Sequence, residues 1–426
     1  SKIDNEVENY GIDINAQVTD NVNVKAGYNR QDFKRFDVES YPGFDTYDQD
    51  TKIDHSGNER KDNWVFDTAY IDVTTDFSLF GTDNTFLVGA NYLEYTYDRF
   101  QKYYNPISIE AGQSVPRPGY SGKVKQSTSE HDTWGIYAQN MMTINDYWQV
   151  LAGVRYDEKR DDDLTENQVS PKFGVIFHPA TNGSVYVQYS ESFMPQGEVS
   201  SGRGKTYVND GEKLDAERGI SYEIGTKWEL FDQRLFVSGA VFDITLENMS
   251  LDVESGKDAS NKVLHKKTQG GEQVHKGAEL MAQGFVTPEL SLTASAMYLD
   301  AELKKAERYE GNRPVDVPEF SASLWSSYKV QDNTNLNLGL IYEGDRYGDA
   351  ANTFKKDGYA RVDMGVSYKH KYDENLDIIA RFNVENLFDT DYFAGGGSTN
   401  SEQKGASGVV VGESRNYMAT IQFKYW

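Results

Sequence analysis

Apolar and polar residues alternate with a period of two through most of the chain. In residues 359–368 the even positions carry Ala, Val, Met, Val and Tyr, whereas the odd positions carry Tyr, Arg, Asp, Gly and Ser. Similar alternation runs through residues 220–230, 335–343 and 376–385. No stretch keeps the apolar stripe of an amphipathic helix over several turns. The pattern therefore predicts an all-β protein whose strands have one apolar and one polar face.

Seventeen segments show this alternation, and no linker-like change of composition divides them into domains. They cover residues 7–19, 22–39, 60–77, 84–104, 129–144, 148–160, 167–179, 184–197, 216–231, 234–253, 274–286, 290–306, 319–330, 334–348, 359–371, 376–393 and 416–426. Short turns, such as residues 20–21 and 232–233, alternate with long polar stretches. The long stretches are residues 98–130, 198–215, 254–273, 307–318, 349–358 and 394–415.

Strands of this kind fit either an antiparallel sandwich or a membrane barrel. Three observations favour a transmembrane antiparallel β-barrel. The segments are many, their connections alternate between short and long as periplasmic turns and extracellular loops do, and tyrosines end many apolar phases, as at a lipid–water boundary. These tyrosines are Tyr156, Tyr189, Tyr298, Tyr328, Tyr342 and Tyr368. In lipid the sheet must close, so the apolar phase would face lipid and the polar phase the bore.

The direction of the first predicted strand bears on what precedes it. If the last strand runs toward the periplasm, the order of short and long connections makes residues 7–19 run the same way. A single-chain bacterial barrel has an even number of strands with both ends on the periplasmic side. We therefore expect at least one further strand before Ser1.

Composition narrows the classes of function. The 426 residues carry a formal net charge of -24, which disfavours nucleic-acid binding. Mean hydropathy is -0.68, and no run of apolar residues is long enough for a membrane-spanning helix. The absence of cysteine excludes disulfides, Cys-ligated zinc, iron–sulfur clusters and thiol catalysis. Aromatic residues make up 13% of the chain, and many of them fall in the long polar stretches.

Several motifs resemble those of TonB-dependent outer-membrane receptors, in particular ferric siderophore receptors of the ferrichrome type. Residues 386–392, NLFDTDY, resemble the NLFDxxY signature, and residues 189–196, YSESFMPQ, resemble YSxSFxPQ. Residues 214–227 resemble LxPExxxxYExGxK, with Ala216 where Pro is usual. Residues 276–280 resemble KGxEL, residues 344–347 resemble the GxRY loop, and the chain ends on an aromatic residue, Trp426. Together these motifs extend over roughly residues 130–426.

The resemblance implies a 22-stranded barrel, of which residues 1–426 would supply the C-terminal part with about 17 strands. The first strands and an N-terminal plug domain, which carries the contact with TonB, would be absent from this chain. The implied ligand is a ferric siderophore, with no covalently bound cofactor. The implied surroundings are outer-membrane lipid and lipopolysaccharide in the bacterial outer membrane, with the receptor as a monomer. The resemblance implies a receptor rather than an enzyme.

Candidate ligand-binding residues are the aromatic and arginine side chains of the long polar stretches and their borders. Aromatic rings offer rigid apolar area, and arginine can pair with an anionic iron chelate. They are Tyr41, Phe44, Tyr47, Tyr103, Tyr104, Tyr120, Phe193, Arg203, Tyr207, Arg308, Tyr309, Arg313, Arg346, Tyr347, Phe354 and Phe393. Structural roles are expected for the signature residues Asn386, Leu387, Phe388, Asp389 and Tyr392 and for Trp426.

Other chemistry has little support in the sequence. The six histidines lack metal-ligand spacing, so no protein-ligated metal is predicted. No catalytic residues are predicted, because no nucleophile elbow, complete P-loop or defined acid–base pair occurs. Two alternative functions remain open: a TonB-dependent receptor for haem, cobalamin or a glycan, and a passive porin. His55 and His265 keep the haem alternative open.

Overall fold

The computed structural model describes residues 2–42, 52–110, 113–114, 116, 119–161, 164–201, 205–397 and 408–425, without the side chains of residues 40–42 and 52–54. The chain divides into two compact units. Unit 1 comprises Ser1–Met141 and Gly153–Val169, and unit 2 comprises Met142–Ala152 and Ser170–Trp426. No helix long and apolar enough to cross a membrane occurs among the described residues.

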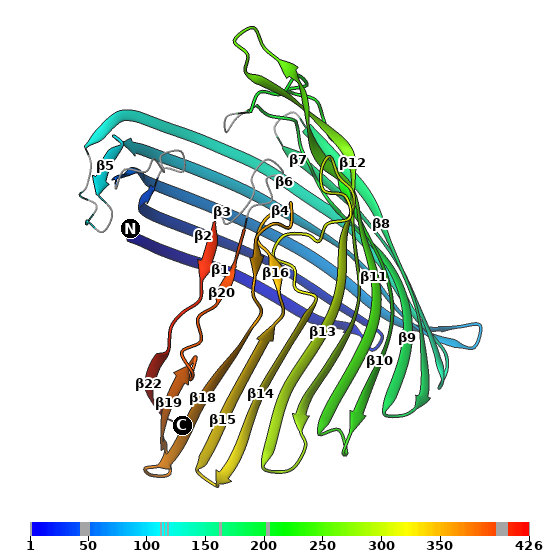
Figure 1. The fold of residues 1–426 in the computed structure, drawn as a ribbon. Helices are drawn as coiled ribbons and strands as arrows, with labels where there is room; N and C mark the ends of the chain where they lie inside the picture. Colours follow the sequence, from blue (N-terminus) through cyan, green and yellow to red (C-terminus); the bar gives the residue numbers. More distant parts are fainter. Residues whose placement is uncertain are drawn as a thin grey trace. The chain divides into compact units, whose positions relative to one another are not determined.

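Unit 1 is built from long antiparallel strands that lie side by side, coloured from blue through cyan to blue-green (Figure 1). They are β1 (Lys2–Thr19), β2 (Val22–Pro42), β3 (Lys52–Leu79), β4 (Thr82–Tyr104), the short β5 (Ile107–Glu110), and most of β6 (Tyr120–Asn145) and β7 (Trp148–Asp161). Each strand from β1 to β4 pairs with the next, and β3 also pairs with β5.

Unit 2 continues as an antiparallel series, from most of β8 (Leu164–Ala180) onward. Its strands are β9 (Gly183–Met194), β10 (Glu217–Leu230), β11 (Leu235–Lys257), β12 (Val263–Phe285), β13 (Leu290–Lys305), β14 (Phe320–Gln331), β15 (Thr334–Glu343), β18 (Tyr359–Lys371), β19 (Leu376–Glu385) and β22 (Asn416–Tyr425). Consecutive members of this series pair, for example β14 with β15 and β15 with β18. The longer connections contain two small ladders, β16 (Arg346–Tyr347) with β17 (Lys355–Lys356), and β20 (Phe393–Gly396) with β21 (Val409–Val411).

Tight turns join the strands at one end, which we call the turn end, and the opposite end is the distal end. Between β3 and β4 the turn is Phe80-Gly81, with φ of 52° and 81°. Two successive residues with positive φ are typical of a type I′ hairpin, whose twist matches that of paired strands. At the distal end the connections are longer, as in residues 195–216 and 306–319.

Near the turn end, the two faces of the unit 1 sheet differ in chemistry. One face is a band of apolar side chains in which Ile14, Ala26, Ile71 and Ala90 lie in one row of the register. This apolar face ends at a row with Tyr28 and Tyr92, and its members remain exposed, with Ile71 at 48%. On the polar face Tyr70 donates a hydrogen bond to Asp13 at 2.8 Å.

Unit 2 repeats this arrangement. On β10, β11 and β12 the apolar side chains Ile224, Val241 and Leu280 are 52%, 54% and 64% exposed. The serines Ser295 and Ser323 lie on the other face, where their hydroxyl groups are 2.9 Å apart. An apolar face that is exposed in both units, rather than packed against a second sheet, is what lipid contact requires.

Each of the seventeen predicted segments contains or overlaps one long strand, but the bounds differ. Two segments run too far: 334–348 takes in both β15 and β16, and 376–393 passes the end of β19 at Glu385 and reaches β20. Several other strands are longer than predicted. The stretches 98–130 and 254–273, predicted as loops, are largely paired as the distal parts of β4, β6, β11 and β12. Tyr103, Tyr104 and Tyr120 therefore lie in strands rather than in a loop. In these distal parts both faces carry polar residues, so the alternation disappears while the backbone pairing continues.

Candidate functional site

The distal rows of β1–β4 carry an unusual set of side chains on the polar face. Beyond the tyrosine row, β2, β3 and β4 continue as paired strands for more than ten residues. Because side chains alternate between faces, Phe33, Trp64 and Tyr97 share one row of the polar face. Arg35, Asp62 and Arg99 share the row two residues beyond them.

Six aromatic rings on this face form what we call the aromatic wall: Phe33, Trp64, Phe66, Tyr95, Tyr97 and His131. Trp64 stacks on Tyr97 with ring centroids 5.0 Å apart and planes 9° apart. Phe33 lies 4.9 Å from Trp64 on the other side. In the next row Tyr95 lies between Phe66, at 4.9 Å, and His131, at 4.3 Å. All six rings are half-buried, so part of each remains open to a ligand.

Next to the aromatic wall lies the arginine cluster, defined as Arg35, Asp37, Glu39, Arg60, Asp62 and Arg99. The Asp37 carboxylate lies 2.7 Å from Arg35 Nε and 2.6 Å from Arg60 Nη2. The Asp62 carboxylate lies 2.7 Å from Arg60 Nε and 3.1 Å from Arg99 Nε, and it accepts a hydrogen bond from the Tyr97 hydroxyl at 2.8 Å. Arg60 thus bridges two buried carboxylates.

These contacts set the ionisation of the cluster. Burial alone would raise the pKa of Asp37, but hydrogen bonds and charge from Arg35 and Arg60 outweigh it and hold its pKa below the usual value. Burial, together with the hydrogen bond to Asp62, raises the pKa of Tyr97 to about 12. Asp37 therefore stays charged and Tyr97 stays a neutral hydrogen-bond donor at neutral pH.

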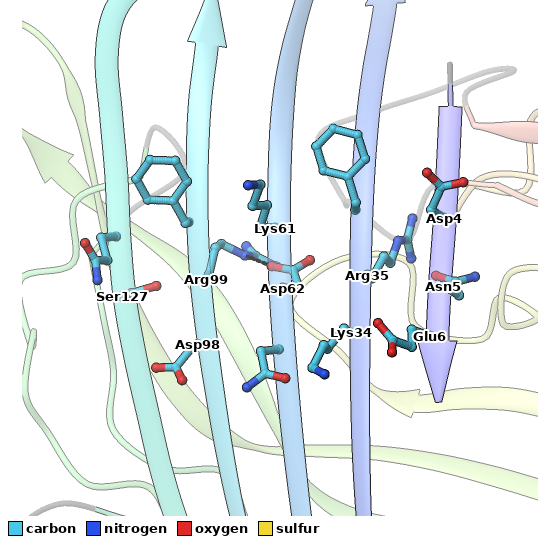
Figure 2. Close-up of a pocket in the computed structure, with 14 residues that line it drawn as sticks. Asp4, Asn5, Glu6, Lys34, Arg35, Lys61, Asp62, Asp98, Arg99 and Ser127 are labelled. Atoms are coloured by element: carbon cyan, nitrogen blue, oxygen red, sulfur yellow. Dashed lines mark hydrogen bonds and ion pairs between the residues drawn. The ribbon is translucent and has the colours of Figure 1, made fainter. Parts of the chain in front are cut away.

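A hollow of about 610 Å³ lies in the same part of the sheet, and residues of β1, β2, β3, β4 and β6 line it. Figure 2 shows Arg35, Asp62 and Arg99 on adjacent strands, with Lys34 and Lys61 nearby. Lys34 and Lys61 belong to the opposite face of the sheet, in rows with Glu6 and Asp4, respectively. The hollow thus adjoins the arginine cluster but is bordered by side chains of both faces.

Two of the predicted unit 1 residues, Tyr104 and Tyr120, come together in the structure, whereas Tyr103 lies in the opposite phase of β4. Tyr104 stacks on Tyr120 at 5.0 Å, and the Tyr120 hydroxyl donates to Glu59 at 2.9 Å. Tyr103 donates to Gln101 at 3.1 Å. Tyr41 lies in β2, although its side chain is not described, and Phe44 and Tyr47 lie outside the described residues.

Four of the predicted unit 2 residues gather around a buried ion network in the distal connections. Arg346, only 2% exposed, lies 3.0 Å from both Asp316 and Glu343, and its guanidinium donates to the Phe393 carbonyl. Lys356, fully buried, also pairs with Asp316. Phe354 meets Phe393 edge to face at 6.2 Å, and Tyr347 pairs through its backbone with Lys355. Arg346 thus fastens the connections together and does not present its charge to solvent.

The other predicted residues of unit 2 lie in separate places. Phe193 is in β9, opposite Arg218. Arg308 pairs with Glu254 at 3.1 Å, and Arg313 lies 3.6 Å from Glu319. Tyr309 occupies a turn with φ of 65°. Arg203 and Trp426 lie outside the described residues.

Tyr207 fastens the connection between β9 and β10 to the β11–β12 hairpin. Its hydroxyl donates to Asp252 at 3.0 Å, and the Lys267 ammonium lies 5.4 Å from its ring centroid. A backbone bridge joins Tyr207 to His265, which is 6% exposed. With Val199 and Leu214, Tyr207 forms a small buried apolar cluster.

The NLFD signature organises the turn that follows β19. Asn386 is 1% exposed with φ of 50°, and its side chain bonds the backbone of Thr390 and the carbonyl of Glu413. Asp389 accepts a hydrogen bond from the Arg415 backbone at 2.7 Å. Leu387 donates its backbone N–H to Val362, Tyr392 stacks on Tyr359 at 4.2 Å, and Phe388 is 69% exposed. Apart from the exposed Phe388, these signature residues thus have structural contacts.

The sequence analysis did not single out the aromatic wall or the arginine cluster. It searched the long polar stretches, whereas these residues lie within strands. A signal was present: Phe33 falls in the same phase as Asn29, Gln31 and Arg35, where a polar residue is expected. No group of three or more His, Asp or Glu side chains able to hold a metal ion occurs in the described part of the chain.

Comparisons with known proteins identify the family to which this architecture belongs. Residues 1–387 match the family described as TonB dependent receptor-like, beta-barrel. The chain belongs to this family. It is 28% identical to the ferrichrome outer membrane transporter/phage receptor of Escherichia coli K12, over 86% of this chain and 49% of the relative. It is 27% identical to the probable TonB-dependent siderophore receptor PiuA of Acinetobacter baumannii, over 72% and 42%. The chain thus spans about half the length of these curated relatives.

Solved structures agree with this assignment at the level of the fold. The TM-score is 0.83 to the siderophore receptor PiuA of Acinetobacter baumannii, at 22% identity, covering 99% of this chain and 65% of that one. It is 0.82 to the ferric preacinetobactin receptor BauA of the same organism, at 18% identity, covering 99% and 63%. The predicted all-β transmembrane barrel fold of a TonB-dependent receptor is confirmed.

Membership of the TonB-dependent receptor family indicates which environment each face of the sheet contacts. The chain is an outer-membrane β-barrel protein, and the family consists of receptors and transporters rather than enzymes. In such barrels the apolar face meets lipid and the polar face lines the interior. The aromatic wall and the arginine cluster, at the distal end of the polar face, therefore belong to the interior wall on the extracellular side.

Proposed function

We propose that this receptor takes up a ferric siderophore by active, TonB-dependent transport. The observation that carries the proposal is the aromatic wall beside the arginine cluster, on the interior side of β2–β4 near the distal end. Half-buried rings and partly exposed guanidinium groups are suited to hold a bulky chelate by face contacts and hydrogen bonds. Relatives named as siderophore receptors support the same conclusion.

In this proposal the protein does no covalent chemistry and needs no bound cofactor. The chelate reaches the wall from the extracellular side and is released inward when TonB acts on the plug domain, which precedes the barrel in this family. Of the 16 side chains predicted as ligand contacts, Tyr104, Tyr120 and Phe193 lie in outward rows of the sheet, and the others stay candidates for capture before the chelate reaches the wall. Arg346 is the weakest of them, because its charge is already used by Asp316 and Glu343.

We also propose that the receptor works as a monomer surrounded by outer-membrane lipid and lipopolysaccharide. The apolar face below the tyrosine row would contact acyl chains. The outward rows above it, which carry Lys34 and Lys61, would meet lipopolysaccharide headgroups. Neither lysine has an acidic partner within 4.0 Å among the ion pairs of the described residues.

The full receptor, purified in detergent, can be titrated with ferric chelates, haem and cobalamin while intrinsic fluorescence is recorded. We expect a ferric chelate to quench the emission, and Trp64→Phe to lose much of the quenching, because Trp64 lies in the aromatic wall. Trp148→Phe is the matched control, because Trp148 is 43% exposed beside the tight turn that precedes β7 and is not part of the aromatic wall.

Two outcomes would contradict the proposal. Quenching by haem alone would indicate a haem receptor, although His265 is too buried to serve as an open haem ligand. Ion conductance through the full receptor without any ligand, together with no saturable quenching, would indicate a porin.

A further inference from the structure

Between the aromatic wall and the turn end, the polar face of unit 1 carries a set of three residues that is repeated along the sheet. In the first set, Tyr70 of β3 lies across Gly27 of β2, and its hydroxyl donates to Asp13 of β1 at 2.8 Å. A β-carbon at Gly27 would collide with the Tyr70 ring, so the glycine allows the ring to lie against the sheet. The ring therefore follows the wall and does not stand out into the interior.

The second set lies on the next strands of the sheet. Tyr137 of β6 lies across Gly89 of β4, and its hydroxyl donates to Asp72 of β3. A β-carbon at Gly89 would collide with both the Asp72 carboxylate and the Tyr137 ring. As in the first set, a long side chain crosses a glycine and reaches an acceptor two strands away.

The third set uses an arginine in place of the tyrosine. Arg155 of β7 lies across Gly135 of β6 and donates to the Asn91 side chain of β4 at 2.8 Å. Asp157 pairs with the Arg155 guanidinium and compensates its charge. The guanidinium carbon also lies 5.1 Å from the centroid of the Tyr137 ring, so the second and third sets are in contact. We call the three sets together the flat wall.

Polar side chains beside the flat wall also bond within the sheet. Asn23 donates to the Asn15 side chain at 2.9 Å, and the Thr68 hydroxyl donates to the Asn29 carbonyl at 3.1 Å. Lys25 lies opposite Asp72 in the register of β2 and β3. Many donors and acceptors of this surface are therefore already bonded inside the sheet.

The polar face of unit 2 differs, because it contains a recess. A hollow of about 430 Å³ is lined on its inward side by Ser295, Ser321, Ser323 and Glu279, among others. Ser323 lies next to the row in which Ala322 pairs with Tyr342, close to the tyrosines that mark the lipid boundary. Side chains of a partner can enter such a recess and interlock with it, whereas they can only rest on a flat surface.

The plug domain that precedes the barrel in this family would meet both surfaces. Separation of two polar surfaces costs most where groups of one are bonded to groups of the other, because both partners are then left without a bond. A wall whose groups are bonded to each other loses fewer such contacts when its partner leaves. Contact of the plug with the flat wall is thus expected to be weaker than its contact with the recess of unit 2.

We infer that the flat wall is the surface from which the plug separates first, so that the passage for the chelate opens along β1–β7. The flat wall continues the strands that carry the aromatic wall, since only the row of Thr68 lies between the rows of Phe66 and Tyr70. The inference rests on the proposed function, because it assigns a route to the chelate that TonB-dependent transport releases.

The test follows the plug of the full receptor in urea, without any chelate. Thr68→Cys, beside the flat wall, and Ser323→Cys, in the recess, each lie one row from a tyrosine row and would each carry a nitroxide spin label. We expect the label at residue 68 to become mobile at a urea concentration at least about 0.5 M lower than the label at residue 323.

Equal midpoints, or earlier release at residue 323, would overturn the inference. Because no chelate is present, that outcome leaves the proposed siderophore uptake intact, whereas the fluorescence titration with ferric chelates tests the uptake proposal by itself.

A substitution in the flat wall tests the physical reason. Tyr70→Phe keeps the ring but frees the Asp13 carboxylate to bond the plug, so the midpoint at residue 68 should rise by at least about 0.3 M while that at residue 323 stays unchanged. Tyr28→Phe is the matched control, because Tyr28 donates to Asp67 at 2.5 Å on the outward face and should change neither midpoint. No rise in Tyr70→Phe, or an equal rise in Tyr28→Phe, would overturn the inference.

Discussion

At the residue scale, the distal interior wall depends on a few buried carboxylates. Asp37 has no exposed side-chain surface and is held by two arginines from different strands. A buried carboxylate of this kind stabilises the fold most when it is charged. Loss of its negative charge leaves two guanidinium groups close together without a compensating charge. Its protonation state therefore couples the stability of β2 and β3 to pH.

Asp37→Asn should lower the free energy of unfolding by about 2–3 kcal/mol at neutral pH, since charge-assisted hydrogen bonds are lost but the arginines keep some access to water. Because folding lowers the pKa of Asp37, its contribution is complete above the unfolded value of about 3.9 and is lost as pH falls through the folded value. The difference in the free energy of unfolding between wild type and variant should thus be constant from about pH 5 to 8 and shrink below pH 4.

Denaturant unfolding of the purified receptor at several pH values measures this difference. Asp32→Asn is the control on the same strand, because Asp32 pairs at 3.4 Å with Arg30, whose side chain is 42% exposed. This substitution should lower the free energy of unfolding by less than about 1 kcal/mol. Equal effects of the two substitutions would contradict the role given to Asp37.

Asn386→Ala should destabilise the receptor by about 2–4 kcal/mol, because three side-chain hydrogen bonds of a buried group are lost. Ligand affinity of the folded receptor should stay unchanged. Asn261→Ala is the control for replacing an asparagine at a positive φ, since Asn261 is exposed and has a similar φ of 64°. A loss of ligand affinity with normal stability would show that the signature contacts ligand instead.

At the element scale, the distal parts of the strands hold the connections that pack on them. In the β11–β12 hairpin the register shifts near Met249, opposite Gly271, and the connection that carries Tyr207 packs on the part beyond this shift. Burial would raise the pKa of Asp252, but hydrogen bonds from Lys205 and Tyr207 and the charge of Lys267 lower it. The contact therefore persists at neutral pH.

Tyr207→Ala should release this connection, so backbone amides of residues 205–214 should exchange hydrogen faster, by about tenfold or more. Tyr207→Phe keeps the ring and loses only the hydroxyl contact with Asp252, so its effect should be smaller. Val208→Ala, at a side chain that is 51% exposed in the same connection, is the control and should change little. Unchanged exchange in Tyr207→Ala would mean that the connection is held by other contacts.

The elements were predictable from the sequence where one face meets lipid and the other meets the interior. There Ile71 and Asp72 alternate as the membrane requires, and every such segment was recognised. The distal parts outside the predicted segments, such as residues 120–128 and 263–273, were missed, because both faces carry polar residues there and only backbone pairing continues. The wall was missed because Phe33, Trp64 and Tyr97 are far apart in sequence, and only the register brings them into one row.

At the scale of the whole molecule, the account depends on the sidedness of the sheet. The apolar phase of each strand is placed against lipid, and the polar phase is placed inside, with the aromatic wall at its extracellular end. The roles of the arginines and the position of the tyrosine row at the lipid–water boundary both follow from this assignment. If the two faces were exchanged, the arginine cluster would face outward and could not line an uptake path.

A single-cysteine scan along β3 tests this sidedness most directly, and the chain has no cysteine of its own to interfere. Spin labels at residues 68–74 of the full receptor in lipid vesicles would be probed with oxygen, which partitions into lipid, and with a water-soluble nickel complex. We predict that oxygen accessibility peaks at residues 69, 71 and 73 and falls at residues 68, 70, 72 and 74. A pattern without a period of two, or one with its peaks at the even positions, would contradict the account.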